Sequence, residues 1–255
     1  MSEAVGRLTE IVRTLRSPEG CPWDREQTHE SLRGALLEEC YEAIEAINNA
    51  DDANLREELG DLLLLVVMHA QMGAERGAFA FEEIAAAVAE KMIRRHPHVF
   101  GDQTAADSAA VLKQWEQIKR REKGENASVL AGVARALPAL MRAQNVQKKA
   151  ARVGFDWGSA IEVLDKLEEE IRELREAMAS GQPAAIGEEA GDLLFSAVNL
   201  ARKLGLESET VLNESTDKFV RRFQALEQTV AAAGKRVEDV SLEELEAHWQ
   251  RAKRA

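Results

Sequence analysis

Cysteines, signal-like segments and long apolar runs are scarce or missing in this 255-residue chain. Its two cysteines, Cys21 and Cys40, have no metal or redox spacing, so the sequence predicts no disulfide framework. The N-terminus lacks a basic stretch followed by an apolar one, and the longest apolar run, Leu62–Met68, is too short to span a bilayer. We therefore expect a cytoplasmic protein without a membrane partner.

Positive charge is also in short supply. The chain has 33 lysines and arginines against 45 aspartates and glutamates, which gives a formal net charge of −12. Because binding to nucleic acid requires a basic surface, this balance argues against nucleic acid as a partner. It also implies that an anionic substrate would arrive with a metal ion.

No segment alternates apolar and polar residues for long enough to predict a sheet, whereas helical spacing is found almost everywhere. Glycines that can end helices stand at Gly77, Gly181 and Gly205, and the segment from Ser241 to Glu244 has the form of a capping box. The sequence therefore predicts an all-α fold.

The chain contains one acidic pattern twice, a Glu-Glu-x-x-Glu followed by a Glu-x-x-Asp. The first copy runs from Glu38 to Asp61 and the second from Glu169 to Asp192, with one constant offset (169 − 38 = 131 and 192 − 61 = 131). A polar segment without apolar periodicity, Arg120–Ser128, separates the copies. We therefore expect an internal duplication with two helical domains, residues 1–125 and 126–255.

The spacing of these acidic residues indicates a metal site. On a helix, residues three apart share a face, so Glu39 lies beside Glu42, and Glu58 lies beside Asp61 on the next helix. Four clustered carboxylates repel one another unless a cation neutralises them, and an all-oxygen ligand set suits Mg²⁺ or Mn²⁺. The alternative is a solvated acidic face, but Asp61 and Asp192 each lead into an apolar run, which predicts burial.

A basic set follows each acidic set, and the loops between them differ in length (218 − 91 = 127 and 249 − 115 = 134). A lysine and an arginine one turn apart, with a tryptophan and a lysine one turn apart on a later helix, can bind phosphates and stack on a base. Ordinary surface charge around a core tryptophan is the alternative. The members are Lys91, Arg95, Trp115 and Lys119 in the first copy, and Lys218, Arg222, Trp249 and Lys253 in the second.

Carboxylates for a hard metal, cations for phosphates and an aromatic ring for a base together predict a nucleoside triphosphate site. No G-x-x-x-x-G-K-[ST] motif is present, so the scaffold is not a P-loop fold. The chemistry left is metal-assisted attack of water on a phosphoanhydride. A ferritin-like oxidase would need two Glu-x-x-His pairs, and the sequence has one, Glu26 to His29, outside the acidic sets. A nucleotide sensor without turnover stays open for the first copy.

Several motifs in the order found here resemble the tandem-domain MazG-type nucleoside triphosphate pyrophosphohydrolases. They are the two acidic sets, Cys21–Asp24, Arg95–Phe100, Leu137–Gln144 and Val153–Trp157, which span most of the chain. The resemblance implies an all-α fold, a helical homodimer, and dependence on Mg²⁺, with Mn²⁺ as a substitute. It also implies cleavage of ribo- or deoxyribonucleoside triphosphates to monophosphate and pyrophosphate, in nucleotide-pool house-cleaning or regulation.

The resemblance also implies a role for each site residue. In the second copy Mg²⁺ would be held by Glu170, Glu173, Glu189 and Asp192, with Glu169 as a supporting partner or the water-activating base. Lys218, Arg222 and Lys253 would bind the leaving phosphates, and Trp249 would contact the nucleoside. The matching first-copy residues are Glu38 and Glu39 as catalytic groups, Glu39, Glu42, Glu58 and Asp61 as metal ligands, and Lys91, Arg95, Trp115 and Lys119 as substrate-binding groups.

The two copies differ at one position on the second acidic helix. Asn199 takes the place of Met68 (199 − 68 = 131), so only the second copy has an amide there that can bond a sugar or base. We therefore assign the main activity to residues 126–255. Whether the first copy is active, regulatory or a scaffold stays open, as do the preferred base and sugar. Trp23 and Trp157, which precede the two acidic helices, either floor a pocket or seal a helix junction.

Overall fold

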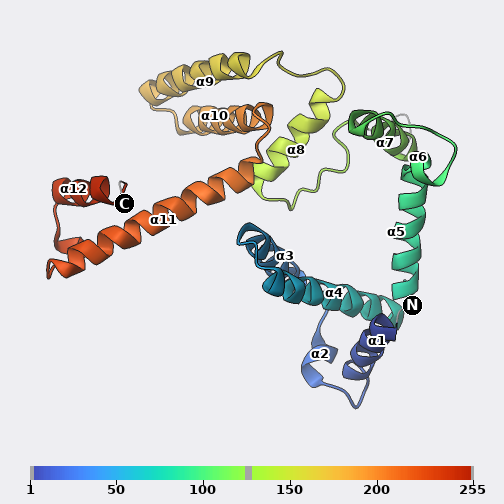
Figure 1. Cartoon of the computed structure of the whole chain (residues 1–255). Helices are drawn as coiled ribbons and strands as arrows, with labels where there is room; N and C mark the ends of the chain where they lie inside the picture. Colours follow the sequence, from blue (N-terminus) through green and yellow to red (C-terminus); the bar gives the residue numbers. More distant parts are fainter. Residues whose placement is uncertain (1–2, 124–127, 254–255) are drawn as a thin grey trace. The chain divides into compact units, whose positions relative to one another are not determined.

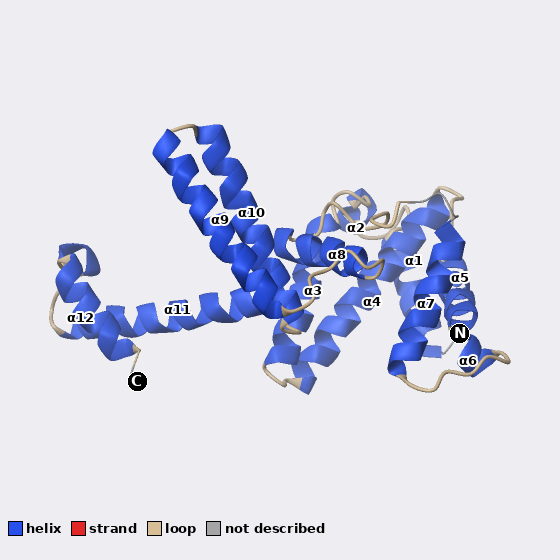
Figure 2. Cartoon of the chain, turned by 90° about the horizontal axis from the view of Figure 1, so that it is seen from above, coloured by secondary structure: helices blue, strands red, loops and turns tan. Residues whose placement is uncertain are grey.

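The computed structural model describes residues 3–123 and 128–253, and every regular element in these ranges is helical (Figures 1 and 2). The all-α prediction is therefore confirmed. The chain divides into two compact units, residues 1–125 and 126–255. The expected domain boundary near residue 125 lies outside the described residues. Among the described helices, none has the length and apolar character needed to cross a membrane.

The first unit is built around an antiparallel helix pair, α3 and α4, with α1 packed on α4 and with α5 leading from α4 to α6 and α7 (Figure 1). Its helices are α1 (Glu3–Leu15), α2 (Pro22–Glu26), α3 (Arg33–Asn48), α4 (Asp52–Glu75), α5 (Phe81–Arg95), α6 (Pro97–Phe100) and α7 (Ser108–Lys123). The expectation that the linker begins at Arg120 was wrong, because residues 120–123 continue α7. Arginine, glutamate and lysine have high helix propensity even where a helix has no apolar face. The prediction used only apolar periodicity and therefore missed these residues.

The second unit repeats the helix pair as α9 and α10. Its elements are α8 (Ala139–Ala151), α9 (Ala160–Ser180), α10 (Pro183–Lys203), α11 (Ser208–Ala232), a 3-10 turn η1 (Val237–Asp239) and α12 (Leu242–Ala252). Helix α8 packs on α10 and α11, and α12 packs on α11. Both views place α12 beside the C-terminal half of the long helix α11, away from α9 and α10 (Figures 1 and 2).

The core of the first unit lies between α1 and α4, where Val12 meets Val67 and Met68. The expectation that the run Leu62–Met68 would be buried on most sides was only half right, because Leu63 and Val66 in the same run are exposed. Neighbouring helices cover one face of α4 and leave the other open. The second unit shows the same pattern, since Val198 is buried while Leu194 of the same helix is exposed to 62%.

The two helix pairs turn at equivalent positions (181 − 50 = 131) with equivalent backbone. Gly181 has a φ of 68°, and Ala50 has a φ of 52° although it carries a Cβ. The predicted helix ends at Gly77 and Gly205 are also confirmed, with φ values of 64° and 76°. Ser241 caps α12 as expected, because its Oγ accepts from the backbone N–H of Glu244 at 3.3 Å.

Candidate active site

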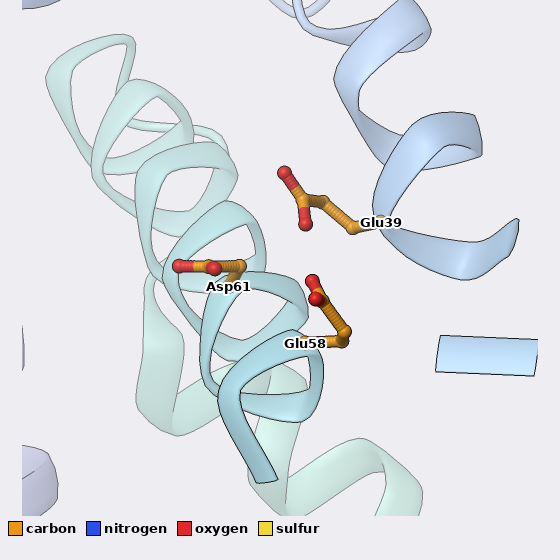
Figure 3. Close-up of side chains that lie close together, drawn as sticks. All are labelled: Glu39, Glu58 and Asp61. Atoms are coloured by element: carbon orange, nitrogen blue, oxygen red, sulfur yellow. The ribbon is translucent and has the colours of Figure 1, made fainter. Parts of the chain in front are cut away.

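The α3–α4 pair brings three of the predicted carboxylates together. Oxygens of Glu39, Glu58 and Asp61 lie within 4.8 Å of one another, with Glu39 reaching from α3 towards the two residues of α4 (Figure 3). Glu42 lies beside this group. Burial raises the pKa of Glu39, Glu42 and Glu58, and the negative charges of the neighbouring carboxylates raise it further.

The α9–α10 pair forms a second carboxylate group in the same way. Oxygens of Glu170, Glu173 and Glu189 lie within 4.8 Å of one another, and Glu170 is only 5% exposed. Asp192 lies next to the group. Burial raises the pKa of Glu189, and the charges of Glu173, Asp192 and Glu170 add to the effect. In each unit three of the four predicted ligands converge and the fourth is adjacent.

Lys166 is a member of the second group that the sequence analysis missed. Its ammonium lies 3.0 Å from Glu170, 3.2 Å from Glu169 and 3.9 Å from Glu173. The hydrogen bond to Glu170 is the largest cause of its raised pKa. The corresponding first-copy position is Ala35 (166 − 131 = 35), so the first acidic set has no cation at the place where Lys166 meets the second. The sequence could have indicated this contact, because a lysine one helical turn before Glu170 lies on the same face of the helix.

Both groups fit a hard divalent ion. They offer only carboxylate oxygens, which are the ligands that Mg²⁺ and Mn²⁺ favour, and the spacing within 4.8 Å allows several oxygens to reach one ion. The pKa values are raised first by burial and then by repulsion between the carboxylates, and a bound cation would offset both effects. Glu58, at 8% exposed, and Glu170 are buried acids of the kind that require such a partner.

The second-copy basic residues form a group of their own. Trp249 of α12 packs on Phe219 of α11 with ring centroids 5.1 Å apart, and the Lys253 ammonium lies 5.8 Å from the Trp249 ring. Lys218 and Arg222 belong to α11. In both views α12, which carries Trp249, lies away from α9 and α10, which carry the second carboxylate group (Figures 1 and 2).

The first-copy basic residues are arranged similarly, but the arginine among them is already in an ion pair. The Lys119 ammonium lies 3.9 Å from the Trp115 ring, and Lys91 and Arg95 lie on α5. Arg95 forms an ion pair with Glu122 at 2.6 Å. Hydrogen bonds from Arg95 and then from Arg94 lower the pKa of Glu122 to about 2. The predicted phosphate-binding arginine of this copy therefore has an internal carboxylate partner.

A pocket of about 560 Å³ opens beside the second carboxylate group. It combines charged members of that group with aromatic walls, and it includes the predicted Asn199. The charged and aromatic lining residues are Lys166, Glu170, Asp192, Asp156, Arg202, Phe155, Trp157 and Phe195. Trp157 therefore lines a pocket, whereas Trp23 is mostly exposed on α2.

The fold and the two carboxylate groups define a class of all-α proteins in which a helix pair carries a cluster of carboxylates. The profile of the MazG nucleotide pyrophosphohydrolase domain matches residues 27–100 and again residues 159–226, which are the two units' helix pairs and their flanks. The chain belongs to this family.

Relatives match over almost the whole length. The nucleoside triphosphate pyrophosphohydrolase/pyrophosphatase MazG of Thermotoga maritima is 49% identical over 247 residues, covering 96% of this chain and 94% of the relative. The nucleoside triphosphate pyrophosphohydrolase of Escherichia coli K12 is 49% identical over 257 residues, covering 98% of this chain and 97% of the relative. The uncharacterised protein YabN of Bacillus subtilis is 44% identical over 245 residues, which is 95% of this chain and 50% of YabN.

Proposed function

We propose that this protein is a Mg²⁺-dependent hydrolase that cleaves nucleoside triphosphates to the monophosphate and pyrophosphate, chiefly in its second unit. The observation that carries the proposal is the pocket in which Glu170 and Asp192 meet aromatic walls, because one cavity there offers groups for a metal-bound phosphate chain and for a base. Family membership and the named relatives support the same activity. We place the enzyme in the cytoplasm, where it acts on the nucleotide pool.

In this mechanism the carboxylates of Glu170, Glu173, Glu189 and Asp192 would hold Mg²⁺, which would supply Lewis acidity for the phosphate oxygens and for activation of water. Glu169 stands beside the three-carboxylate group and accepts from Lys166 at 3.2 Å, so it is placed to take the proton of the attacking water. The water oxygen bonds to the α-phosphorus as the bond to the α–β bridging oxygen breaks. Pyrophosphate then leaves.

We also propose that two copies form a homodimer in which the site is completed. The cations Lys218, Arg222 and Lys253 would meet the carboxylates of the other copy's α9–α10 pair, since in one chain α12 lies away from that pair. The exposed apolar side chains of these helices support such a contact. Among those of α9, α10 and α11 are Ile161, Leu194, Leu212, Phe219 and Val220. Burial of these side chains would provide the hydrophobic contribution to association.

A nucleotide panel tests the activity. The full chain is incubated with ribo- and deoxyribonucleoside triphosphates and Mg²⁺, and the products are resolved, with Glu170→Gln and Glu39→Gln run alongside. We expect monophosphate and pyrophosphate, with loss of at least about 100-fold in Glu170→Gln because a metal ligand is removed. Retention in Glu39→Gln would assign the reaction to the second unit. Diphosphate and phosphate as products would contradict the mechanism, and absence of turnover would favour a nucleotide sensor.

Mixing two inactive variants tests the composite site. Glu170→Gln lacks a carboxylate and Lys218→Met lacks a cation, so each should be inactive alone if both groups act in the reaction. Mixed after partial denaturation and refolding, they should regain about a quarter of wild-type activity per total chain. This value assumes random pairing, in which half the dimers are mixed and each mixed dimer has one intact site. No recovery, with mixed dimers demonstrated by tagged copies, would contradict sharing of the site between chains.

A further inference from the structure

One buried glutamine in the second unit has a side-chain oxygen without a hydrogen-bond partner among the described residues. Gln147 of α8 is 6% exposed, and its Nε2 donates to the backbone oxygen of Phe195 at 2.8 Å. Its Oε1 is buried and has no hydrogen-bond partner among the described residues. The orientation of the amide is fixed chemically, because only the NH₂ end can bind a carbonyl oxygen.

A glutamine one turn earlier on the same helix provides a comparison. Gln144 is 2% exposed, and its Nε2 donates to the Leu206 oxygen at 2.9 Å. Its Oε1 accepts from the backbone N–H of Ser208 at 2.7 Å and from the Ser208 hydroxyl at 2.6 Å. Gln144 therefore joins α8 to the start of α11, and the fold uses both ends of its amide. Gln147 lines the 560 Å³ pocket instead, and no group among the described residues uses its oxygen.

A second amide that lines the pocket, that of Asn199, is bound through its oxygen instead of its NH₂ group. The Oδ1 of Asn199 accepts from Arg202 Nε at 3.0 Å and from Arg202 Nη2 at 2.7 Å. Arg202 is in turn paired with Asp156, which also accepts from Lys203 at 3.1 Å. The Asn199 oxygen is thus occupied, and the amide offers the pocket its NH₂ group. Of the two amides that line the pocket, Gln147 therefore keeps an unused acceptor and Asn199 an unused donor.

The walls beside these amides are aromatic. Phe155, Trp157 and Phe195 line the same pocket, and Phe155 is 82% exposed. Flat aromatic faces with a nearby acceptor and donor complement a heterocyclic base rather than a sugar or an aliphatic chain. Adenine and cytosine both carry an amino donor next to a ring-nitrogen acceptor on one edge.

We propose that Gln147 and Asn199 form a nucleobase subsite, in which Gln147 Oε1 accepts a hydrogen bond from the amino group of an adenine- or cytosine-type edge and Asn199 donates to the adjacent ring nitrogen. This inference rests on the proposed function, because the pocket adjoins Glu170 and Asp192. The subsite selects for bases with an exocyclic amino group at that edge. A base that lacks this group leaves the Gln147 oxygen buried without a donor.

Binding of matched nucleotides tests the subsite. The probes are α,β-methylene ATP, whose α–β bridge resists hydrolysis, and the same compound with hydrogen in place of the 6-amino group. A cytosine compound and its 4-unsubstituted counterpart form a second pair. Titration calorimetry with Mg²⁺ and the full chain should show binding about tenfold or more weaker for each compound that lacks the amino group. Gln147→Met should bring both ratios close to one, since methionine has no acceptor to leave unpaired.

Gln144→Met is the matched control, because it alters an equally buried glutamine whose amide serves the fold. It should lower the melting temperature and keep the binding ratios of the wild type. If this variant does not fold, the wild-type ratios and those of Gln147→Met decide alone. Equal binding within the wild-type pairs, no binding of either amino compound, or unchanged ratios in Gln147→Met would overturn the subsite.

Turnover of unmodified ATP in the same preparations is measured separately. Selective binding without turnover would contradict the proposed function and leave the subsite in place. Turnover without selective binding would contradict the subsite alone.

Discussion

At the scale of single residues, the two carboxylate groups balance their charge differently. In the first unit Glu39, Glu58 and Asp61 face one another, and the pKa of Glu58 is raised by burial and by its neighbours. In the second unit the Lys166 ammonium contacts Glu170 directly. We therefore expect charge repulsion to destabilise the metal-free protein mainly in its first unit. The stability of the second unit should depend on Lys166.

Replacing Lys166 tests this dependence. Lys166→Met should lower the free energy of unfolding of the metal-free protein by about 1–3 kcal/mol, because the buried Glu170 loses its cation. The measurement is urea denaturation with and without Mg²⁺, and Mg²⁺ should recover most of the loss. Lys235→Met removes an exposed pair with Glu244 and should change the free energy by about 0.5 kcal/mol or less. Equal effects of the two substitutions would contradict the role of Lys166.

The raised pKa of Glu58 predicts a pH dependence with a definite sign. A carboxyl group whose folded pKa lies above its ordinary value of 4.5 adds stability at low pH, and this contribution is lost as the pH rises through the folded pKa. Thermal melts of metal-free wild type and Glu58→Gln should therefore diverge above a pH of about 4.5 in favour of the variant. Mg²⁺ should stabilise the wild type more than the variant. A difference that is constant with pH would refute this account.

At the scale of helices, the turn between the paired helices sets where the carboxylates meet. In the first unit Ala50 adopts the left-handed conformation, and the Asp51 N–H closes the end of α3 by donating to Ala46 O at 2.9 Å. Asp51 then caps α4, because its Oδ1 accepts hydrogen bonds of 3.1 Å from the backbone N–H groups of Ala53 and Asn54. This short connection holds α3 against α4, so that Glu39 and Glu58 face each other.

The strained alanine in this turn gives a reciprocal pair of predictions. Ala50→Gly should raise the free energy of unfolding by about 0.5–1 kcal/mol, because glycine adopts positive φ without steric cost. Gly181→Ala should lower it by about 1 kcal/mol, and a Cβ built there meets no atom within 4 Å, so the cost is purely conformational. Chemical denaturation of both variants measures the changes. Effects of the same sign would contradict the equivalence of the two turns.

At the scale of the whole molecule, each unit keeps its carboxylates and its basic residues on separate helix groups. Carboxylates occupy α3–α4 and α9–α10, and the cations and tryptophans occupy α5–α7 and α11–α12. The helix pairs also leave apolar side chains uncovered, among them Val66 and Leu194. Association of two chains would cover such faces and unite the separated groups.

Introducing a charge on the exposed face of α10 tests whether association of two chains requires that face. Leu194 is 62% exposed in the single chain, so Leu194→Lys should change the helix content of the monomer little. We expect its mass in solution, measured by light scattering, to fall from twice 28.2 kDa to 28.2 kDa, with loss of hydrolysis. Circular dichroism is the control for folding. A variant that remains dimeric and active would exclude this face from the interface.

The sequence by itself determined the helical class, the duplication and the convergence of carboxylates. These features depend on local spacing, since residues such as Glu58 and Asp61 must share a helix face and Gly181 must end a helix. The same reasoning failed for residues 120–123 and for the exposed side of Leu62–Met68, because covering a helix face depends on which other elements reach it.

Only the tertiary structure decided the contacts between residues distant in sequence. It paired Arg95 with Glu122, turned the Asn199 oxygen towards Arg202 and left the oxygen of Gln147 without a partner beside the pocket. It also placed α12, which carries Trp249, away from α9 and α10, which carry the carboxylates that the sequence assigned to the same site. Helical periodicity fixes which side chains share a face, whereas the packing of one helix on another decides which groups meet across space.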